Sequence, residues 1–187
     1  MLVKTFGAAV QGISATIVTI EVNVSQGIRF LIVGLPDNAV RESHERIASA
    51  LSLSGKRLPR MQVVINMAPA DIRKEGSAYD LPLAVGILAA SGQIQSDLLE
   101  HYVVMGELSL DGGMKPIKGV LPIAIKAKES GYKGLVLPAQ NAQEAAVVAG
   151  IDVYGVQDIS EVIAFFNGSS ELNPVKVDAN EIGRAHV

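Results

Sequence analysis

Short apolar runs alternate with helical segments in the second half of the chain, and this alternation restricts the fold more than any other feature. We expect strands at 134–137 and 151–154, and helices at 119–130, 139–149 and 159–166, joined by connections of only a few residues. Strands that alternate with helices in this way are typical of a parallel or mixed sheet covered by helices. The pattern therefore predicts an α/β domain.

The amino-terminal part begins with strands instead. Apolar and polar residues alternate over 14–24, which predicts a half-buried strand, and a turn at Gln11-Gly12 joins it to a strand at 3–10. A third strand is expected at 29–33. The simplest arrangement of the three is an antiparallel meander.

A first helix is expected to begin after Asp37 or Asn38, which can cap it, and to end near Gly55. Its charged residues are expected to face water: Arg41, Glu42, Glu45 and Arg46. A buried strand follows at 61–67, and a second helix at 79–91 is apolar nearly all round and therefore buried. A strand at 102–110 and its return at 114–117 enclose a tight turn at 111–113.

Composition limits the domain count and the kinds of partner. The chain has 187 residues, 49% of them hydrophobic and only 4% aromatic, which suits one domain with a core of Val, Ile, Leu and Ala. The formal net charge is -3, so no overall positive field attracts nucleic acid or anionic lipid. A local basic patch remains open as a contact site.

Several kinds of site are excluded by the sequence. The chain has no cysteine, and its three histidines lack metal-ligand spacing, so we predict no metal site. No glycine-rich phosphate-binding motif is present, so we predict no cofactor in this chain. No signal peptide or apolar run of 18 residues is visible, so we expect a cytoplasmic location and no membrane partner.

The loop at 68–80 is the most unusual segment, because charged residues crowd a connection between a strand and a helix. Asp71, Ser77 and Asp80 are its cleft candidates, since α/β folds often place their sites at such connections. One interpretation is a solvated loop whose Gly76 and Ser77 start the helix. The other is a catalytic loop in which Ser77 is a nucleophile.

Three long segments carry a family resemblance: GLPDNAVRESHERIASAL at 34–51, NMAPADIRKEGSAYDLPLAVGILAASG at 66–92 and GELSLDGGMKPIKGVLP at 106–122. Together they resemble the amino-terminal domain of the Mg-chelatase-like AAA+ ATPases, the group of YifB and the competence protein ComM. The resemblance covers about residues 1–167 and implies the Lon-protease-like fold, related to the second domain of ribosomal small-subunit protein five. Residues 168–187 are then expected to be a linker or disordered tail toward an AAA+ module.

The resemblance also implies where a Lon-type catalytic pair would lie. Lon proteases carry their nucleophile in a D-G-P-S-A-G motif; Glu75-Gly76-Ser77 matches its first three positions, so the nucleophile position falls on Ala78. The lysine position falls on Leu121. Neither side chain can do this chemistry, so we expect no Lon-type peptidase. The alternative is a shifted pair of Ser77 with a nearby lysine: Lys74, Lys115 or Lys118.

Five basic residues flank two loops and are candidates for one contact surface: Lys56, Arg57, Arg60, Arg73 and Lys74. They either are ordinary solvated charges or contact DNA or a neighbouring subunit. The resemblance implies a hexameric parent that hydrolyses ATP with Mg²⁺ and, in ComM-like members, moves branched DNA in natural transformation. We therefore predict a non-catalytic assembly or substrate-contact domain. A serine peptidase using Ser77 and a peptide-binding adaptor are the alternatives.

Overall fold

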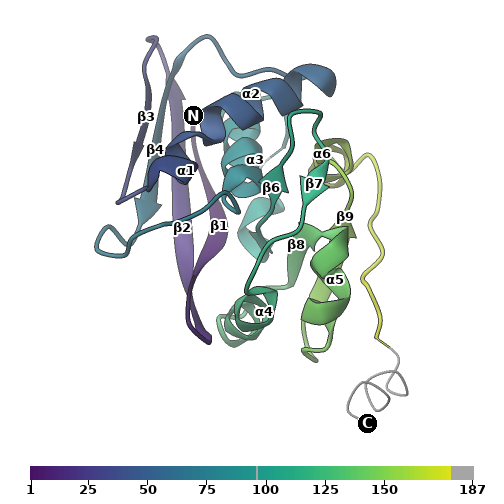
Figure 1. Ribbon diagram of the computed structural model, residues 1–187. Coiled ribbons are helices and arrows are strands. Elements are labelled where there is room, and N and C mark those ends of the chain that lie inside the picture. Colours follow the sequence, from purple (N-terminus) through teal and green to yellow (C-terminus); the bar gives the residue numbers. More distant parts are fainter. Residues whose placement is uncertain (96, 178–187) are drawn as a thin grey trace.

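The computed structural model describes residues 1–95 and 97–177, which form a mixed α/β fold (Figure 1). The largest sheet has the strand order β1-β2-β4-β3. Its strands are β1 (Leu2–Gln11), β2 (Ser14–Ser25), β4 (Gln62–Ala68) and β3 (Phe30–Val33). The predicted β1–β2 hairpin is confirmed, since the two strands pair antiparallel from Leu2 opposite Asn23 to Gln11 opposite Ser14.

The predicted meander is wrong for the third strand. β3 does not pair with β2, because β4 lies between them, antiparallel to β2 and parallel to β3. The connection from β3 to β4 runs through two helices, and such a crossover returns the chain in the same direction. β3 therefore lies at the edge of the sheet.

The helix expected after Asp37 is divided into α1 (Asn38–Arg41) and α2 (Ser43–Leu53). The predicted cap is confirmed: Oδ1 of Asp37 accepts a hydrogen bond from the amide of Val40 at 2.8 Å. α3 (Asp80–Ala90) is buried at every position, as its continuous apolar sequence predicts. It packs closely on the sheet at Gly86, where an added Cβ would lie 2.7 Å from a methyl group of Val22.

The second sheet confirms the parallel arrangement predicted for the carboxyl-terminal half. Its strand order is β5-β8-β9 and both pairs are parallel. The strands are β5 (Tyr102–Val104), β8 (Gly134–Pro138) and β9 (Asp152–Val156), and the helices of this half are α4 (Val120–Glu129), α5 (Ala139–Ala146) and α6 (Ile159–Phe166). A 3₁₀ turn, η1 (Leu99–His101), precedes β5.

The single strand expected at 102–110 is interrupted. After β5 the chain leaves the sheet, and β6 (Glu107–Leu108) pairs with β7 (Met114–Lys115) in a separate hairpin. The change of direction occurs at Gly106, whose amide donates to the carbonyl of Ala78 at 2.8 Å. Glycine fits here because a Cβ would lie only 2.2 Å from Cε of Met114. The hairpin thus passes beside the start of α3.

The carboxyl-terminal segment stays on the domain as far as it is described. Residues 169–177 have no helix or strand, but the amide of Val175 donates to the carbonyl of Val153 at 2.8 Å, and Leu172 and Val175 pack against the core. Figure 1 shows this segment, in yellow, running past α6 and α5. Contacts with the domain therefore continue to Val175, beyond the predicted boundary at 167, and residues 178–187 of the predicted tail lie outside the described residues.

Helices in the described part of the chain are all too short or too polar to span a bilayer.

Candidate functional site

A cavity of about 470 Å³ opens at the start of α3. Its walls come from several parts of the sequence: residues 75–79, Ala8 and Val10 of β1, Met105 and Glu107, residues 116–118 before α4, and Ile123 of α4. Glu75, Glu107 and Lys118 contribute charged groups to it. The cavity therefore lies at the strand-to-helix connection that the sequence indicated as the place for a site.

Ser77 and Ala78 both line this cavity, as the loop interpretation requires. The carbonyl of Ser77 accepts the amide of Asp80 at 3.2 Å, and the carbonyl of Ala78 accepts that of Gly106, so backbone bonds fix the turn into α3. The hydroxyl of Ser77 makes no hydrogen bond to any described residue. Ala78, which the resemblance assigns to the nucleophile position, has only a methyl group in the cavity wall.

Leu121, which the resemblance assigns to the lysine position, brings no amine to the cavity. Leu121 is the second residue of α4, is 37% exposed and does not line the cavity. Lys118 does line it, but its side chain is exposed. A general-base lysine needs a desolvated site that keeps it neutral, and an exposed lysine lacks one.

Lys74 is the largest fully buried side chain, so the prediction that it belongs to an exposed contact surface is wrong. Its Nζ donates to the carbonyl of Gly34 at 2.7 Å and to that of Pro69. Burial lowers the pKa of Lys74 despite the opposing effect of the Asp71 carboxylate. The lysine holds the loop against the end of β3 and is not available to Ser77 or to DNA.

Asp80 is fully buried, so its assignment to the cleft is also wrong. Its carboxylate accepts hydrogen bonds from Oγ of Ser43 at 2.6 Å, from Nε of Arg46 at 2.7 Å and from the amide of Leu108 at 3.1 Å. Burial raises the pKa of Asp80, while the bonds from Arg46, Ser43 and Leu108 oppose the rise. The carboxylate joins α2, α3 and β6 and has a structural role.

Arg46 was expected to face water, but its side chain is only 18% exposed and pairs with Asp80. The Asp80 carboxylate raises the pKa of the guanidinium, which therefore stays charged. The sequence contains a pattern that could have predicted the inward direction of Arg46. Positions 43, 46, 47 and 50 have the i, i+3, i+4, i+7 spacing of one helix face, which also carries the apolar residues Ile47 and Ala50. That face is directed inward, so Ser43 and Arg46 belong to it.

The other two charged residues of the loop are exposed. Asp71 is at the surface and does not line the cavity. Arg73 pairs with Glu75 at 3.2 Å between Nε and Oε1, and both side chains are about two-thirds exposed. Such a surface pair contributes little stability.

The remaining basic candidates lie at the opposite end of β4. Lys56, Arg57 and Arg60 precede this strand and Arg73 follows it, and seven strand residues span about 23 Å. The five residues therefore do not form one surface. Nζ of Lys56 donates to the carbonyl of Gln93 at 3.3 Å, whereas Arg57 and Arg60 are exposed.

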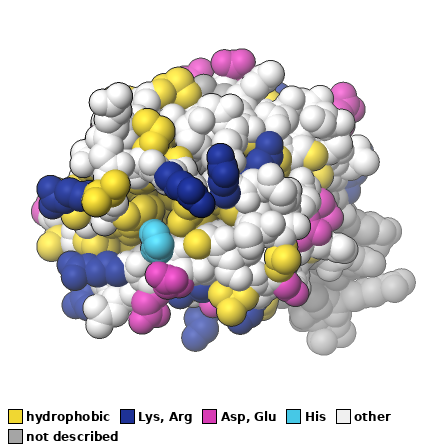
Figure 2. Space-filling model, turned by 90° about the horizontal axis from the view of Figure 1, so that it is seen from above, with side chains coloured by type: hydrophobic (Ala, Val, Ile, Leu, Met, Phe, Trp, Pro, Cys, Tyr) yellow, Lys and Arg dark blue, Asp and Glu magenta, His cyan; other side chains and the backbone are white. Residues whose placement is uncertain are grey.

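Arg60 lines a hollow of about 160 Å³ with apolar neighbours, among them Ile28, Phe30 and Leu58. Figure 2, which views the molecule from the side of α2, shows Lys and Arg side chains around hydrophobic ones on this face. We refer to Lys56, Arg57 and Arg60 as the basic end. Residues 1–95 and 97–177 contain no group of three His, Cys, Asp or Glu side chains that could hold a metal ion.

Comparison with known proteins identifies the family. The family model described as subunit ChlI of Mg-chelatase matches residues 20–141. The chain belongs to this family. It is 39% identical over 172 residues to competence protein ComM of Haemophilus influenzae, which is 91% of this chain and 34% of that protein. It is 37% identical over 173 residues to YifB of Escherichia coli, 91% of this chain and 34% of that protein.

A more distant similarity concerns the fold. The chain is 30% identical over 142 residues to Lon protease 2 of Bacillus subtilis, which covers 74% of this chain and 25% of that protein. The expected family and the Lon-protease-like α/β fold are thus confirmed. The chain spans about a third of the length of the curated relatives that it matches at 37–39% identity.

Proposed function

We propose that this chain is a non-catalytic assembly and substrate-contact domain of a Mg-chelatase-like AAA+ ATPase. One observation supports the proposal: Ala78, which the resemblance assigns to the nucleophile position, lines the cavity, while Lys74 in the same loop is fully buried and donates to two carbonyl groups. A Ser–Lys pair needs a hydroxyl and a neutral amine in contact. Neither Ala78 nor Lys74 provides its part of such a pair.

The parent protein is proposed to be a cytoplasmic ATPase that uses ATP and Mg²⁺ in a module outside this chain. The name of the ComM relative refers to competence, which supports a role in processing DNA taken up during natural transformation. Other copies of the chain are the first proposed partners, as subunits of a hexameric ring. DNA is the second.

The basic end is the proposed DNA contact. Arg57 and Arg60 are exposed and close in sequence, and Arg60 borders an apolar hollow. Exposed guanidinium groups bind phosphate by releasing condensed counterions, which gives a binding constant that falls with salt. Arg73 is excluded from this contact because it lies at the other end of β4 and pairs with Glu75.

The test is a salt series of binding to labelled branched, single-stranded and duplex DNA. The unchanged domain is compared with a double variant, Arg57→Ala with Arg60→Ala, and with Arg73→Ala as the matched control. Loss of two phosphate contacts reduces the slope of log K against log salt concentration by about 2. The control keeps the full slope. Equal slopes for all three proteins, or no binding at low salt, would refute the DNA contact.

A second candidate function is a peptide-binding adaptor, and the cavity itself favours it. The cavity of about 470 Å³ lies beside β1 and is lined by apolar residues together with Glu75, Glu107 and Lys118. Saturable binding of an unstructured peptide without cleavage supports this function. Binding is then expected to be lost in a variant with a bulky side chain in the cavity, such as Ala78→Phe. Cleavage of the peptide would instead support a peptidase based on Ser77.

A further inference from the structure

β3 is an open edge of the four-stranded sheet and lies at one side of the molecule (Figure 1). In the described part of the chain, β4 is the only strand that pairs with it. The amide of Val63 donates to the carbonyl of Arg29 at 2.8 Å, and bonding direction alternates along a parallel strand, so every second residue after Arg29 faces β4. The N–H and C=O groups of Phe30 and Ile32 therefore point away from the sheet.

The loop around Lys74 covers this edge only beyond the end of β3. Nζ of Lys74 binds the carbonyl of Gly34, and its amide donates to the carbonyl of Leu35 at 3.0 Å. A parallel bridge joins Lys74 to Pro36. The loop thus pairs with residues 34–36, and within the described residues β3 has no paired strand on the side opposite β4.

β3 is only four residues long, but it lacks two other features that often protect an edge strand. Its sequence, FLIV, contains no proline and no charged residue, and both are common on edges that must not pair. Large apolar side chains are exposed on both flanks of β3 and at its last residue: Ile28 at 95%, Leu35 at 52% and Val33 at 48%. An open edge with exposed apolar neighbours fits the addition of a strand from another chain.

Two hollows along this edge can receive alternate side chains of an added strand. One, of about 160 Å³, is lined by Phe30, Leu58 and Met61 among others. The other, of about 370 Å³, is lined by β3 residues from Phe30 to Ile32 and by Arg41. Phe30 is common to both, so the hollows are adjacent along the strand.

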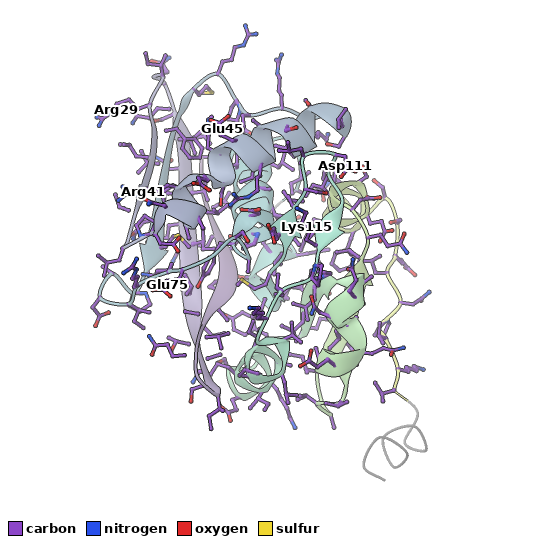
Figure 3. All side chains as sticks on the ribbon, in the orientation of Figure 1. Arg29, Arg41, Glu45, Glu75, Asp111 and Lys115 are labelled. Atoms are coloured by element: carbon purple, nitrogen blue, oxygen red, sulfur yellow. The ribbon has the colours of Figure 1, made fainter. Side chains whose placement is uncertain are left out.

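The charges around the edge determine which partner fits. Arg29 and Arg41 are exposed on the side of the molecule that carries β3 (Figure 3). Glu75 lies on the same side, but it is paired with Arg73. Pairing of two copies through β3 would bring their own arginines together, which is unfavourable.

From these observations we propose that the edge of β3 binds an extended, acidic segment of another protein, which joins the sheet as an additional strand. Main-chain hydrogen bonds form at Phe30 and Ile32, apolar side chains of the segment enter the two hollows, and a carboxylate pairs with Arg41. This site is separate from the cavity at Ala78. It shares the hollow of about 160 Å³ with Arg60 of the basic end, but the addition of a strand at Phe30 and Ile32 requires no contact with DNA.

The experiment is selection of a phage-displayed library of random twelve-residue peptides on the domain, followed by affinity measurements with the enriched peptides. Enriched sequences are expected to alternate apolar residues with Asp or Glu. Ile32→Pro removes an N–H group that points away from the sheet, a change that edge strands tolerate. We expect this variant to bind the peptides at least tenfold more weakly. Ile32→Val keeps the N–H and leaves the affinity within about twofold.

Arg41→Glu provides a second variant that does not alter the strand, since Arg41 is exposed. Selection on this variant is expected to lose the acidic preference and to enrich Lys or Arg. The proposal is overturned if the peptides bind the unchanged domain, Ile32→Pro and Arg41→Glu equally. It is also overturned if Ala78→Phe, a change in the cavity, abolishes their binding. Dimerisation of the unchanged domain that is lost in Ile32→Pro would show that β3 pairs with a second copy. This result would also overturn the proposal of an acidic partner.

Discussion

Nε of Arg46 lies 2.7 Å from Oδ2 of Asp80, and this ion pair joins α2 to the first residue of α3, next to Tyr79 in the wall of the candidate cavity. Oγ of Ser43 and the amide of Leu108 complete the surroundings of the carboxylate. The start of α3, which follows the cavity-lining residues 75–79, therefore depends on a buried charge that accepts several hydrogen bonds. In α3 all eleven residues are buried, so no water replaces a lost partner easily.

Removal of Arg46 should consequently be costly. Arg46→Met leaves the Asp80 carboxylate buried and unpaired, and we expect the free energy of unfolding to fall by about 3–5 kcal/mol. Urea denaturation followed by circular dichroism measures it. The matched control is Arg46→Met with Asp80→Asn, which removes both charges and should recover at least half of the loss. A change below about 1 kcal/mol in the single variant would show that the pair is not buried as described.

Lys74→Met tests the buried lysine. It leaves the carbonyls of Gly34 and Pro69 without their donor, and we expect a loss of about 1–3 kcal/mol at pH 7, measured by urea denaturation. The pKa of Lys74 is lowered in the folded state, so between that pKa and the ordinary lysine value of about 10.4 the unfolded chain binds more protons. Stability from this group therefore rises with pH across that interval.

The comparison of the two proteins isolates this effect. The difference in unfolding free energy between the unchanged protein and Lys74→Met should increase from pH 7 to pH 10.5, since all other titrating groups are common to both. Measurements at four pH values suffice. A difference that decreases toward pH 10.5 would mean that the folded state stabilises the charged ammonium instead.

Gly34→Ala tests the close approach of the loop after β3 to β4. Gly34 has φ +104, and an added Cβ would lie 2.1 Å from the carbonyl oxygen of Met67. The change combines strain with a backbone clash and should cost at least about 2 kcal/mol of unfolding free energy. Gly55→Ala is the control, with a similar positive φ of +78 but open space around it, and should cost about 1 kcal/mol. Equal costs would argue against the close contact.

Ser77 is predicted to be chemically inert. Treatment with a fluorophosphonate reagent should leave the intact mass unchanged at pH 8, because no described lysine is bound to its hydroxyl and Lys118 is exposed. The control is a variant, Ala78→Ser with Leu121→Lys, that restores both side chains of the Lon-type pair. An adduct on the unchanged protein that disappears in Ser77→Ala would revive the peptidase hypothesis.

The sequence predicted most local elements because their patterns are local. The alternation over 14–24 and the apolar continuity of 79–91 each determine one element and its burial, and both are confirmed. Asp37 was recognised as a cap for the same reason. The edge position of β3 was missed, because strand order depends on which distant strand pairs with it, and four apolar residues contain no such information.

The candidate site was located in the correct loop, but the roles of its charged residues were not predicted. Lys74 and Asp80 are buried by partners 40 and 34 residues away in sequence, Gly34 and Arg46, and charged residues in a loop usually face water. The division of the basic residues between two ends of β4 also follows from tertiary structure alone. Only the inward spacing of Ser43 and Arg46 on α2 could have shown part of this arrangement.

The most direct test of the proposed substrate contact is a titration of the ¹⁵N-labelled domain with unlabelled branched DNA, followed by amide chemical shifts. The account predicts shifts at residues 56–61 and their neighbours at 26–30, with residues 75–79 around the cavity unchanged. Shifts confined to 75–79 and 116–118, or none at DNA concentrations that saturate the parent protein, would contradict it.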